Sequence, residues 1–384
     1  MDNYNFSVDG IKYWDIGQGS YLTDGKAGMS SGKSVTERLF SFFARANYSY
    51  QDKYMLSASI RHEGSSKFAA DNRWANFWSA TAGWRISNEE FMKDFDWLDD
   101  LKIRFGYGVT GNNDFSATYM ANMLGSDTNW MMPNGTWAYS YGKSQNVNPN
   151  LGWEEKKEWN LGVDYSFFEG RLYGKFDYYR REVDNLLFSV KVPQPPYTQG
   201  SQMQNIGSME SKGWEFEVGG DIIRTKDFTW SSSMNLSHNT GKILTLEGDN
   251  SYHNGNGFVA PGTPGDAARM EAGSTIGSFY MWKFAGFDDE GSFLLYNKDG
   301  EVIPAAQKTE NDKQYIGNYT PKLIIGWSHT LTYKNFDLGI NLRSWIDFDV
   351  YNTINMYYGI QGQGNLNVLK DAYGKFNHIK DEKQ

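Results

Sequence analysis

The sequence predicts an all-β fold, an antiparallel transmembrane β-barrel of which this chain carries about ten to twelve strands. Three observations lead to this prediction. Segments of about ten residues, the length a tilted strand needs to cross a bilayer, alternate apolar with polar side chains. Short turns and long loops join these segments in alternation. Aromatic residues make up 16% of the chain although its mean hydropathy is -0.63, which suits strands with one face in lipid and the other in water.

The alternation of side chains is clearest in residues 155–168. Successive side chains of a strand point to opposite faces, so every second residue shares a face. The apolar face of this segment has Trp159, Leu161, Val163, Tyr165 and Phe167. The polar face has Glu158, Asn160, Gly162, Asp164 and Ser166. After a tight turn at 169–170 the same alternation continues through residues 171–181, so the two segments are expected to pair as a hairpin.

Four further strand pairs follow from the same pattern and complete the predicted wall of the barrel. A single helical turn at 88–92 is expected within one of the short connections. The expected pairs are residues 39–50 with 54–63, 75–87 with 101–110, 155–168 with 171–181, 213–223 with 228–237, and 323–333 with 336–343.

Long connections separate these pairs, and we expect them to be loops. They cover residues 64–74, 111–154, 184–212, 238–274 and 288–321. Short periplasmic turns on one side and long extracellular loops on the other are typical of barrels in the outer membrane of bacteria. The alternative is a secreted or surface β-sandwich that binds glycans, but a sandwich rarely has so many long loops without secondary structure of their own.

Composition excludes several other classes of protein. No apolar run of about 18 residues occurs, which argues against membrane-spanning helices. The chain has no cysteine, so disulfides and thiolate metal sites are excluded. Its net charge of -9 argues against a nucleic-acid partner. The start of the chain is polar and has no export signal. We therefore expect a fragment of a longer barrel, since a barrel of these strands alone would leave open edges.

Several segments, in order, resemble the SusC-like subgroup of TonB-dependent outer-membrane transporters of Bacteroidetes (the RagA/SusC family). The resemblance covers nearly the whole chain. It rests on the segments SFFARANYSYQDKYMLSASIRHEGSSKF (41–68), FWSATAGWRISNEEFM (77–92), LKIRFGYGVTGNNDF (101–115), NPNLGWEEKKEWNLGVDYSF (148–167), DNLLF (184–188), NIGSMESKGWEFEV (205–218), GSTIGSFYMWKFAGF (273–287) and YIGNYTPKLIIGWSHTLTYKNFDLGI (315–340).

The resemblance implies a barrel of about 22 strands with an N-terminal plug domain. It further implies a segment that contacts TonB, a SusD-like surface lipoprotein as partner, and import of a bulky nutrient, either an oligosaccharide or a peptide. Residues 1–384 are then the central-to-late part of one barrel domain in the outer membrane, surrounded by lipid. The plug, the TonB-contacting segment, the first strands and the last few strands are absent from this sequence, so we expect that the fragment does not transport alone.

The loop sequence NWMMPNGTWAYSY contains the candidate ligand-binding residues. Its aromatic side chains combine a large apolar contact area with a polar O–H or N–H group, which suits stacking on sugar rings or binding a peptide. These residues are Trp130, Trp137, Tyr139 and Tyr141. The alternative is a loop that folds on itself or meets the lipoprotein. Four other tryptophans near the expected strand starts are assigned to an interfacial aromatic girdle: Trp153, Trp159, Trp214 and Trp230.

The sequence favours neither an enzyme nor a metal or cofactor site. The five histidines are scattered and show no ligand spacing. Residues 297–301 (NKDGE) fit a β-turn better than a calcium loop, because an EF-hand register would place Leu295 and Ala306 at ligand positions. Glu215 and Glu217 lie roughly 7 Å apart on one strand face. A glycosidase with this carboxylate pair remains an alternative, but a position on the water-filled inner face of the barrel explains the pair more simply.

Overall fold

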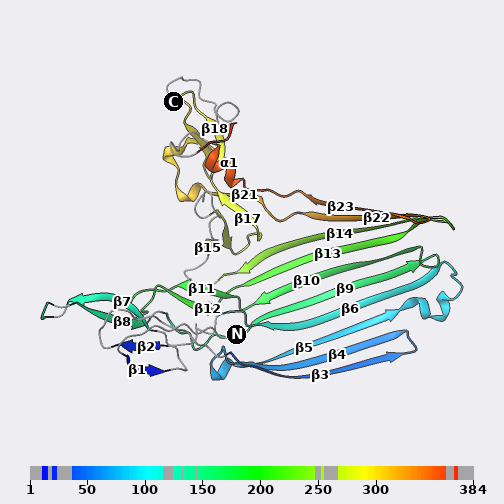
Figure 1. Cartoon of the computed structure of the whole chain (residues 1–384), viewed down its shortest axis with the longest axis horizontal. Coiled ribbons are helices and arrows are strands. Elements are labelled where there is room, and N and C mark those ends of the chain that lie inside the picture. Colours follow the sequence, from blue (N-terminus) through cyan, green and yellow to red (C-terminus); the bar gives the residue numbers. More distant parts are fainter. Residues whose placement is uncertain are drawn as a thin grey trace.

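Ten long antiparallel strands form one continuous sheet in the computed structural model of the chain (Figure 1). The structure describes residues 11–15, 20–23, 37–115, 124–131, 133–135, 137–143, 145–246, 252–254, 267–359 and 367–370. The sheet is open, with β3 and β23 at its two edges. Its strands are β3 (Leu39–Tyr50), β4 (Tyr54–Ser65), β5 (Trp74–Arg85), β6 (Leu98–Asn112), β9 (Glu154–Phe167), β10 (Leu172–Asp184), β13 (Ser208–Arg224), β14 (Phe228–Thr245), β22 (Leu323–Tyr333) and β23 (Phe336–Ile346).

All five strand pairs expected from the sequence are present, and the strands follow one another in the sheet in chain order. The main difference is the length of β13 and β14, which extend beyond the expected 213–223 and 228–237. In the added part, Glu210 pairs with Lys242 and Lys212 with Thr240. There the outward-pointing positions are polar while Met209 pairs with Ile243 on the other face, so the apolar alternation of the wall has ended, but the backbone ladder continues.

The strand register separates the side chains into two kinds of row across the sheet. One row runs Ile103, Val163, Phe176, Phe216, Leu236 and Ile325. The neighbouring row runs Lys102, Asp164, Lys175, Glu217 and Asn235. Because a one-residue slip would exchange the two faces, this register confirms the alternation that the sequence predicted.

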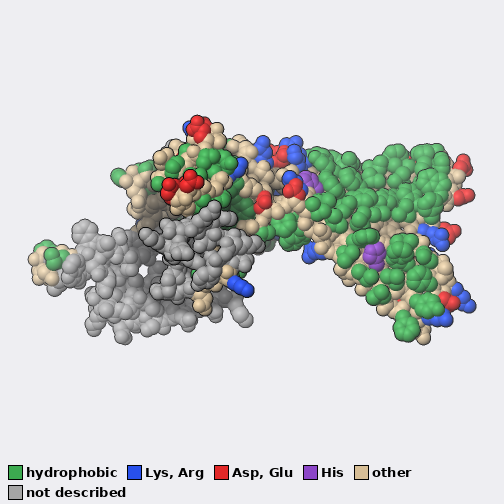
Figure 2. Space-filling view, turned by 90° about the horizontal axis from the view of Figure 1, so that it is seen from above, with side chains coloured by type: hydrophobic (Ala, Val, Ile, Leu, Met, Phe, Trp, Pro, Cys, Tyr) green, Lys and Arg blue, Asp and Glu red, His purple; other side chains and the backbone are tan. Residues whose placement is uncertain are grey.

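The apolar face of the sheet is open to its surroundings. Leu56, Phe105 and Leu342 are 53%, 48% and 52% exposed. Figure 2 shows apolar side chains covering the strand bodies between charged side chains at the turn end and near the loops. A β-sandwich would bury such a face under a second sheet, whereas no other sheet among the described residues has more than three strands. The sandwich alternative is therefore wrong, and the apolar face is the outer, lipid-facing side of a barrel wall.

Short turns join the strands at one end of the sheet (Figure 1). Residues in the left-handed region make these turns tight, for example Gln51 and Asp52 with φ of 51° and 57°. The turn after β9 ends with Gly170 at φ 76°, a conformation that glycine adopts without strain. The expected helical turn is present as two short 3-10 helices, η2 (Ile86–Asn88) and η3 (Glu90–Met92).

The opposite end of the sheet carries the long connections, which contain more regular structure than expected. They hold short hairpins and small sheets, so describing them as loops was wrong. These are β7 (Leu124–Met131) with β8 (Trp137–Lys143), β11 (Leu187–Lys191) with β12 (Ser201–Asn205), β15 (Tyr252–Asn254) with β16 (Arg269–Glu271), β17 (Ser278–Met281) with β21 (Gln314–Asn318), and β18 (Lys283–Phe287) with β19 (Phe293–Tyr296) and β20 (Val302–Pro304). Of these, β17 and β18 lie between the expected loops 238–274 and 288–321.

The ends of the chain are described only in part. Near the N-terminus, β1 (Ile11–Asp15) pairs with β2 (Ser20–Thr23). After β23 comes the short helix α1 (Thr353–Tyr358). Within the part of the chain that the structure describes, no helix is long and apolar enough to cross a membrane.

Candidate functional site

A cluster of charged side chains joins three neighbouring strands on the inner face of the sheet. Arg104 of β6 donates from Nε and Nη2 to the two carboxylate oxygens of Asp164 on β9, each at 2.8 Å. Its Nη2 also donates to Asp177 on β10 at 3.2 Å. Planar two-point contacts of this kind are among the strongest charge-assisted hydrogen bonds. The cluster therefore ties β6, β9 and β10 together from the side of the lumen.

Gly162 makes this cluster possible. It lies on β9 beneath the guanidinium, and a Cβ added there would lie 2.7 Å from both Arg104 Cζ and Asp177 Oδ1. A side chain at this position would push the cation away from one of its carboxylates. The polar face of the strand thus has a glycine where the charges need room.

Other charges on the inner face are also paired. Lys175 lies 3.2 Å from Glu217, and Arg181 lies 2.9 Å from Glu158. The inner wall therefore has many charges of both signs, most of them compensated locally. Glu217 belongs to this network of ion pairs, as expected for a residue on the solvated inner face of the barrel.

Between these ion pairs the inner wall is lined by hydroxyl and amide groups. Ser59 and Ser79 share a hydrogen bond of 2.8 Å across β4 and β5. By strand register, further residues of this kind on the same face are Ser57, Thr81, Ser231, Ser233, Asn235, Ser237, Ser328 and Thr330. Such a surface offers many donors and acceptors but little net charge.

Above the strands, a small buried core joins the long connections to one another. It consists of Phe68, Phe77, Phe115, Leu151 and Trp153. The Trp153 indole donates to the carbonyl of Arg73 at 3.2 Å, and its ring packs edge to face against Phe77 with centroids 5.4 Å apart. Assigning Trp153 to the girdle was wrong, because it is only 7% exposed. It directly precedes β9 and meets apolar partners from another connection and from β5, namely Phe68 and Phe77.

The remaining predicted girdle residues lie on the outer face. Trp159 packs against Tyr178 with ring centroids 5.4 Å apart. Trp214 lies beside His238, with centroids 6.1 Å apart. Trp230, at the turn end of β14, donates from its indole nitrogen to Nδ1 of His329 at 3.4 Å.

Asparagine side chains fasten the β11–β12 hairpin to the segment before β9. Asn146 is nearly buried and donates to the carbonyls of Gln199 and Ser201 at 2.6 and 2.8 Å. Asn148 donates to the carbonyl of Met203 at 3.0 Å, and Asn205 donates to that of Gly152 at 3.0 Å. We call the buried core together with Asn146, Asn148 and Asn205 the loop platform.

The four predicted ligand-binding residues lie on the β7–β8 hairpin, which belongs to the same connection as Asn146. Trp130 is opposite Ala138, Trp137 is opposite Met131, and Tyr139 is opposite Asn129. Tyr141 is opposite Ser126. The side chains of Trp130, Trp137, Tyr139 and Tyr141 lie outside the described part of the structure, so their contact with a ligand stays a prediction.

The histidine side chains that the structure describes, His62, His238 and His329, show no common site. His62 stacks on Trp74 with ring centroids 4.7 Å apart, while His238 and His329 lie on the outer face. The side chain of His253 and all of His378 lie outside the described residues. Among the residues that the structure describes, no group of three His, Cys, Asp or Glu side chains is placed to hold a metal ion.

The sequence NKDGE forms the β-turn that was expected between β19 and β20. The amide of Gly300 donates to the carbonyl of Asn297 at 3.1 Å. The side-chain oxygen of Asn297 accepts from the amides of Asp299 and Glu301. This oxygen is therefore used by the turn itself.

Sequence reasoning did not find the loop platform or the Arg104 cluster. One signal for the platform was available, the repeated asparagines of NVNPN (146–150), a residue type that favours bonding to nearby backbone. A glycine within the polar face of β9 was a weaker signal for the cluster.

An apolar outer face, a polar inner face, short turns at one end and structured loops at the other define a class of protein: the wall of an outer-membrane β-barrel. The family model described as TonB dependent receptor-like, beta-barrel matches residues 2–352. The chain belongs to this family, whose members are outer-membrane receptors and transporters and not enzymes. The glycosidase alternative is thus wrong.

Relatives agree with the SusC-like resemblance. The chain is 34% identical to the TonB-dependent receptor SusC of Bacteroides thetaiotaomicron, over 85% of this chain and 33% of that protein. It is 31% identical to the TonB-dependent receptor P3 of Formosa agariphila, over 89% of this chain and 35% of that protein. The chain therefore spans about a third of the length of these curated relatives.

Solved structures with the same fold include those of the RagAB system. The RagAB peptide transporter aligns with a TM-score of 0.70 and 27% identity, over 83% of this chain and 35% of that chain. The RagAB peptide importer in its open-open state aligns with a TM-score of 0.73 and 26% identity, over 89% and 36%.

Proposed function

We propose that the protein to which this wall belongs imports a bulky nutrient across the outer membrane in a TonB-dependent manner, together with a SusD-like lipoprotein. An oligosaccharide is the proposed substrate. Membership of the TonB-dependent receptor family and similarity to SusC support the transport activity. This chain would supply part of the barrel wall, part of the lumen surface and several extracellular loops.

The chemistry of the inner wall is the observation that favours an oligosaccharide. Its hydroxyl and amide groups match the many donors and acceptors of a sugar chain. Its charges are largely compensated, as in the contact of Arg104 with Asp164 and Asp177. A wall with little uncompensated charge has little electrostatic attraction for a charged substrate.

The β7–β8 hairpin is the proposed point of capture. Aromatic residues there, including Trp130 and Trp137, would stack on sugar rings at the open end of the barrel. The loop platform supports this assignment because it fixes the segment that follows β8 through Asn146. A fixed support lowers the ordering cost of binding.

Peptide import is the second candidate. The observation in its favour is the structural similarity to RagAB, which is described as a peptide transporter. Peptides also contain amide groups that an inner wall of Ser, Thr and Asn residues can bind.

Uptake measurements in the native bacterium test both candidates. Cells without the gene, and cells complemented with it, would be given labelled oligosaccharides and labelled peptides of similar mass. We expect the deletion to abolish uptake of an oligosaccharide and to leave peptide uptake unchanged. Loss of peptide uptake alone would reject the oligosaccharide, and uptake unchanged for both would reject import of either.

A loop variant tests the point of capture. Replacing Trp130, Trp137, Tyr139 and Tyr141 together by alanine is expected to raise the substrate concentration for half-maximal uptake at least tenfold. Phe293→Ala is the matched control, because Phe293 is also an exposed aromatic of a long connection but lies on β19. An equal effect of both changes would place capture elsewhere.

A further inference from the structure

A polar cavity lies at the end of the sheet that carries the long connections, where β14 changes partners. The pairing of β22 with β14 ends at Ile324 opposite Ser237. Beyond this point residues 274–276 run beside β14, and the amide of Ile276 donates to the carbonyl of Gly241 at 2.9 Å. A cavity of about 470 Å³ lies in the gap between these two partners of β14. Its lining includes the polar residues Asn318, Thr320, Lys322, Asp347 and Asp349.

The two carboxylates of this cavity are only partly used by the protein itself. Asp347 accepts from the Lys322 ammonium at 2.5 Å through its Oδ2 atom. Asp349 accepts from the amide of Asn318 at 2.9 Å, also through Oδ2. Among the residues that the structure describes, none donates a hydrogen bond to the Oδ1 atom of either carboxylate. An ionised carboxylate has room for several hydrogen bonds, so both side chains can still accept from the hydroxyl groups of a ligand.

An exposed tryptophan of the inner face lies next to this cavity. Trp345 pairs with Ile324, which is opposite Ser237, so the register places its side chain on the polar inner face of the sheet. Trp345 is 52% exposed. Asp347, which lines the cavity, follows it by two positions in the chain. An aromatic surface and a polar cavity are therefore neighbours at the extracellular end of the lumen.

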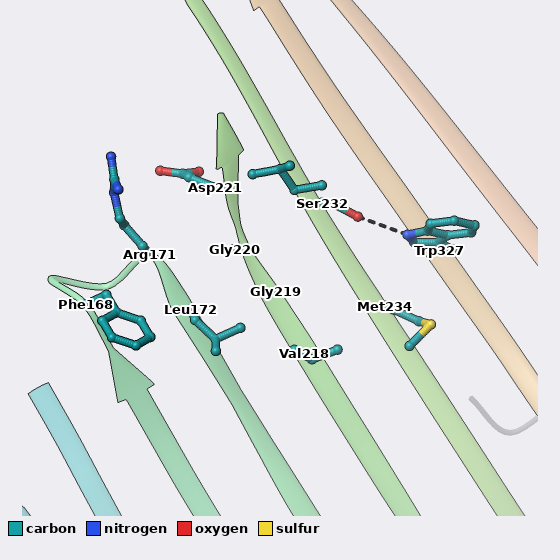
Figure 3. Close-up of a pocket in the computed structure, with 11 residues that line it drawn as sticks. Phe168, Arg171, Leu172, Val218, Gly219, Gly220, Asp221, Ser232, Met234 and Trp327 are labelled. Carbon is teal, nitrogen blue, oxygen red and sulfur yellow. Dashed lines mark hydrogen bonds between the residues drawn. The ribbon is translucent and has the colours of Figure 1, made fainter. Parts of the chain in front are cut away.

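A groove on the outer face of the sheet shows a different combination of side chains (Figure 3). It has a volume of about 590 Å³, and its apolar lining includes Leu172, Val218 and Met234. The hydroxyl of Ser232 in this groove already accepts a hydrogen bond of 2.9 Å from the Trp327 indole. Sugar hydroxyls would lose their water there and find few partners. The polar cavity beside Trp345 therefore suits a sugar, whereas the outer groove does not.

We propose that Trp345 and the polar cavity together bind one sugar unit of the imported oligosaccharide. The apolar C–H face of the sugar ring stacks on the Trp345 indole, which supplies a large contact area. Neighbouring sugar hydroxyls donate to Asp347 and Asp349 and accept from Lys322, and hydrogen bonds to such charged groups are stronger than those between neutral groups. The inference rests on the proposed function and adds to it a second sugar contact, distinct from the β7–β8 hairpin.

Binding of labelled sugars by the full-length protein in detergent tests the proposal. The probes are neutral oligosaccharides from partial hydrolysis of starch, xylan and mannan, and the fraction that the bacterium imports is used for binding. Trp345→Ala removes the stacking surface, and the double change Asp347→Asn with Asp349→Asn removes the charged acceptors. Each of these two variants is expected to raise the dissociation constant for the imported fraction at least tenfold.

Two matched variants control for general effects. Trp327→Ala removes a tryptophan that is 43% exposed from the neighbouring strand but from the outer face. Asp337→Asn removes a carboxylate from the inner face of β23 at its turn end, where Asp337 pairs with Thr332. Both are expected to bind the sugar with unchanged affinity, and folding of every variant is checked by its gel mobility before and after boiling.

Three results would overturn this sugar site while leaving the proposed function intact. The first is equal affinity in all variants. The second is weaker binding in the carboxylate variant but not in Trp345→Ala, which would leave no stacked sugar. The third is weaker binding of labelled peptides with sugar binding unchanged, which would make the cavity a peptide site. If the bacterium imports none of the oligosaccharide fractions through this protein, the oligosaccharide as substrate fails, and the sugar site fails with it.

Discussion

Glu89 is the residue that fixes the connection between β5 and β6. Its carboxylate accepts hydrogen bonds from the Tyr54 hydroxyl at 2.6 Å, from the Trp84 indole at 3.0 Å and from the Lys53 ammonium at 3.0 Å. These donors lower the pKa of Glu89 from 4.5 to about 2. One ionised side chain thus joins two neighbouring short connections.

The lowered pKa predicts a dependence of stability on pH. The stabilising contribution of Glu89 is complete above its unfolded pKa of 4.5 and is lost as the pH falls through about 2. The unfolding midpoint of the full-length protein in detergent, measured by tryptophan fluorescence between pH 5 and about 2, is expected to fall. In Glu89→Gln this fall should be smaller, because the titrating group has been removed. Equal falls in both proteins would show that Glu89 does not carry the effect.

Gly162 gives a second prediction at the scale of one residue. Gly162→Ala is expected to destabilise the barrel by about 1–3 kcal/mol, the usual cost of adding bulk to a packed site, because the new methyl group displaces Arg104. Gly339→Ala is the control, since nothing lies within 4 Å of a Cβ added there. Urea unfolding followed by gel mobility measures the difference. A wild-type midpoint for Gly162→Ala would contradict the crowding argument.

At the scale of elements, the long connections hold one another in place through the loop platform. Its parts come from segments far apart in the chain, with Asn146 and Ser201 separated by 55 positions. Each element there is too small to be stable alone. The β11–β12 hairpin therefore depends on the segment before β9.

Trp153→Ala tests this dependence. Loss of a large buried aromatic is expected to destabilise the platform by about 3–5 kcal/mol while the transmembrane strands remain folded. Limited proteolysis should then cut residues 192–200 faster, with no change in the shift of gel mobility on boiling.

A hydrogen-bond variant gives a second test of the platform. Asn146→Ala leaves the carbonyls of Gln199 and Ser201 without their donor, at a cost of about 1–3 kcal/mol, and is expected to expose the same proteolytic site. Asn150→Ala changes an exposed asparagine of the same segment and should cleave at the normal rate. Similar cleavage in both asparagine variants would mean that the hydrogen bonds of Asn146 do not order the β11–β12 hairpin.

For the whole molecule, the decisive property is the separation of its two faces. Phe176 is 38% exposed on the apolar face, and Ser233 lies on the inner face by register. The same change in side chain therefore meets hydrocarbon at one position and water at the other.

This separation predicts opposite outcomes for a pair of arginine variants in the full-length protein. Phe176→Arg is expected to destabilise the membrane-embedded barrel by about 2–4 kcal/mol, the usual cost on a lipid face near the midplane. Ser233→Arg should change stability by less than about 1 kcal/mol, because its charge remains hydrated. Folding titrations in lipid vesicles with urea measure both. A larger effect at Ser233 would reverse the assignment of the faces.

Local patterns were sufficient to predict the strands and their partners. Residues 39–50 and 323–333 were placed with their observed bounds, because alternation and turn residues are properties of neighbouring positions. The pattern failed for residues 208–212 and 238–245, where lipid no longer distinguishes the faces. It also failed for the hairpins of the long connections, which depend on distant partners.

The sequence by itself determined the class of fold, the strand order, which side chains face lipid and the resemblance to SusC-like proteins. These properties follow from the pleat of a strand, which repeats every two residues. Only the tertiary structure decided that Trp153 is buried in the loop platform and that Arg104 donates to an aspartate 73 positions away. These features arise from contacts between strands, whose register and twist bring together residues that no short stretch of sequence connects.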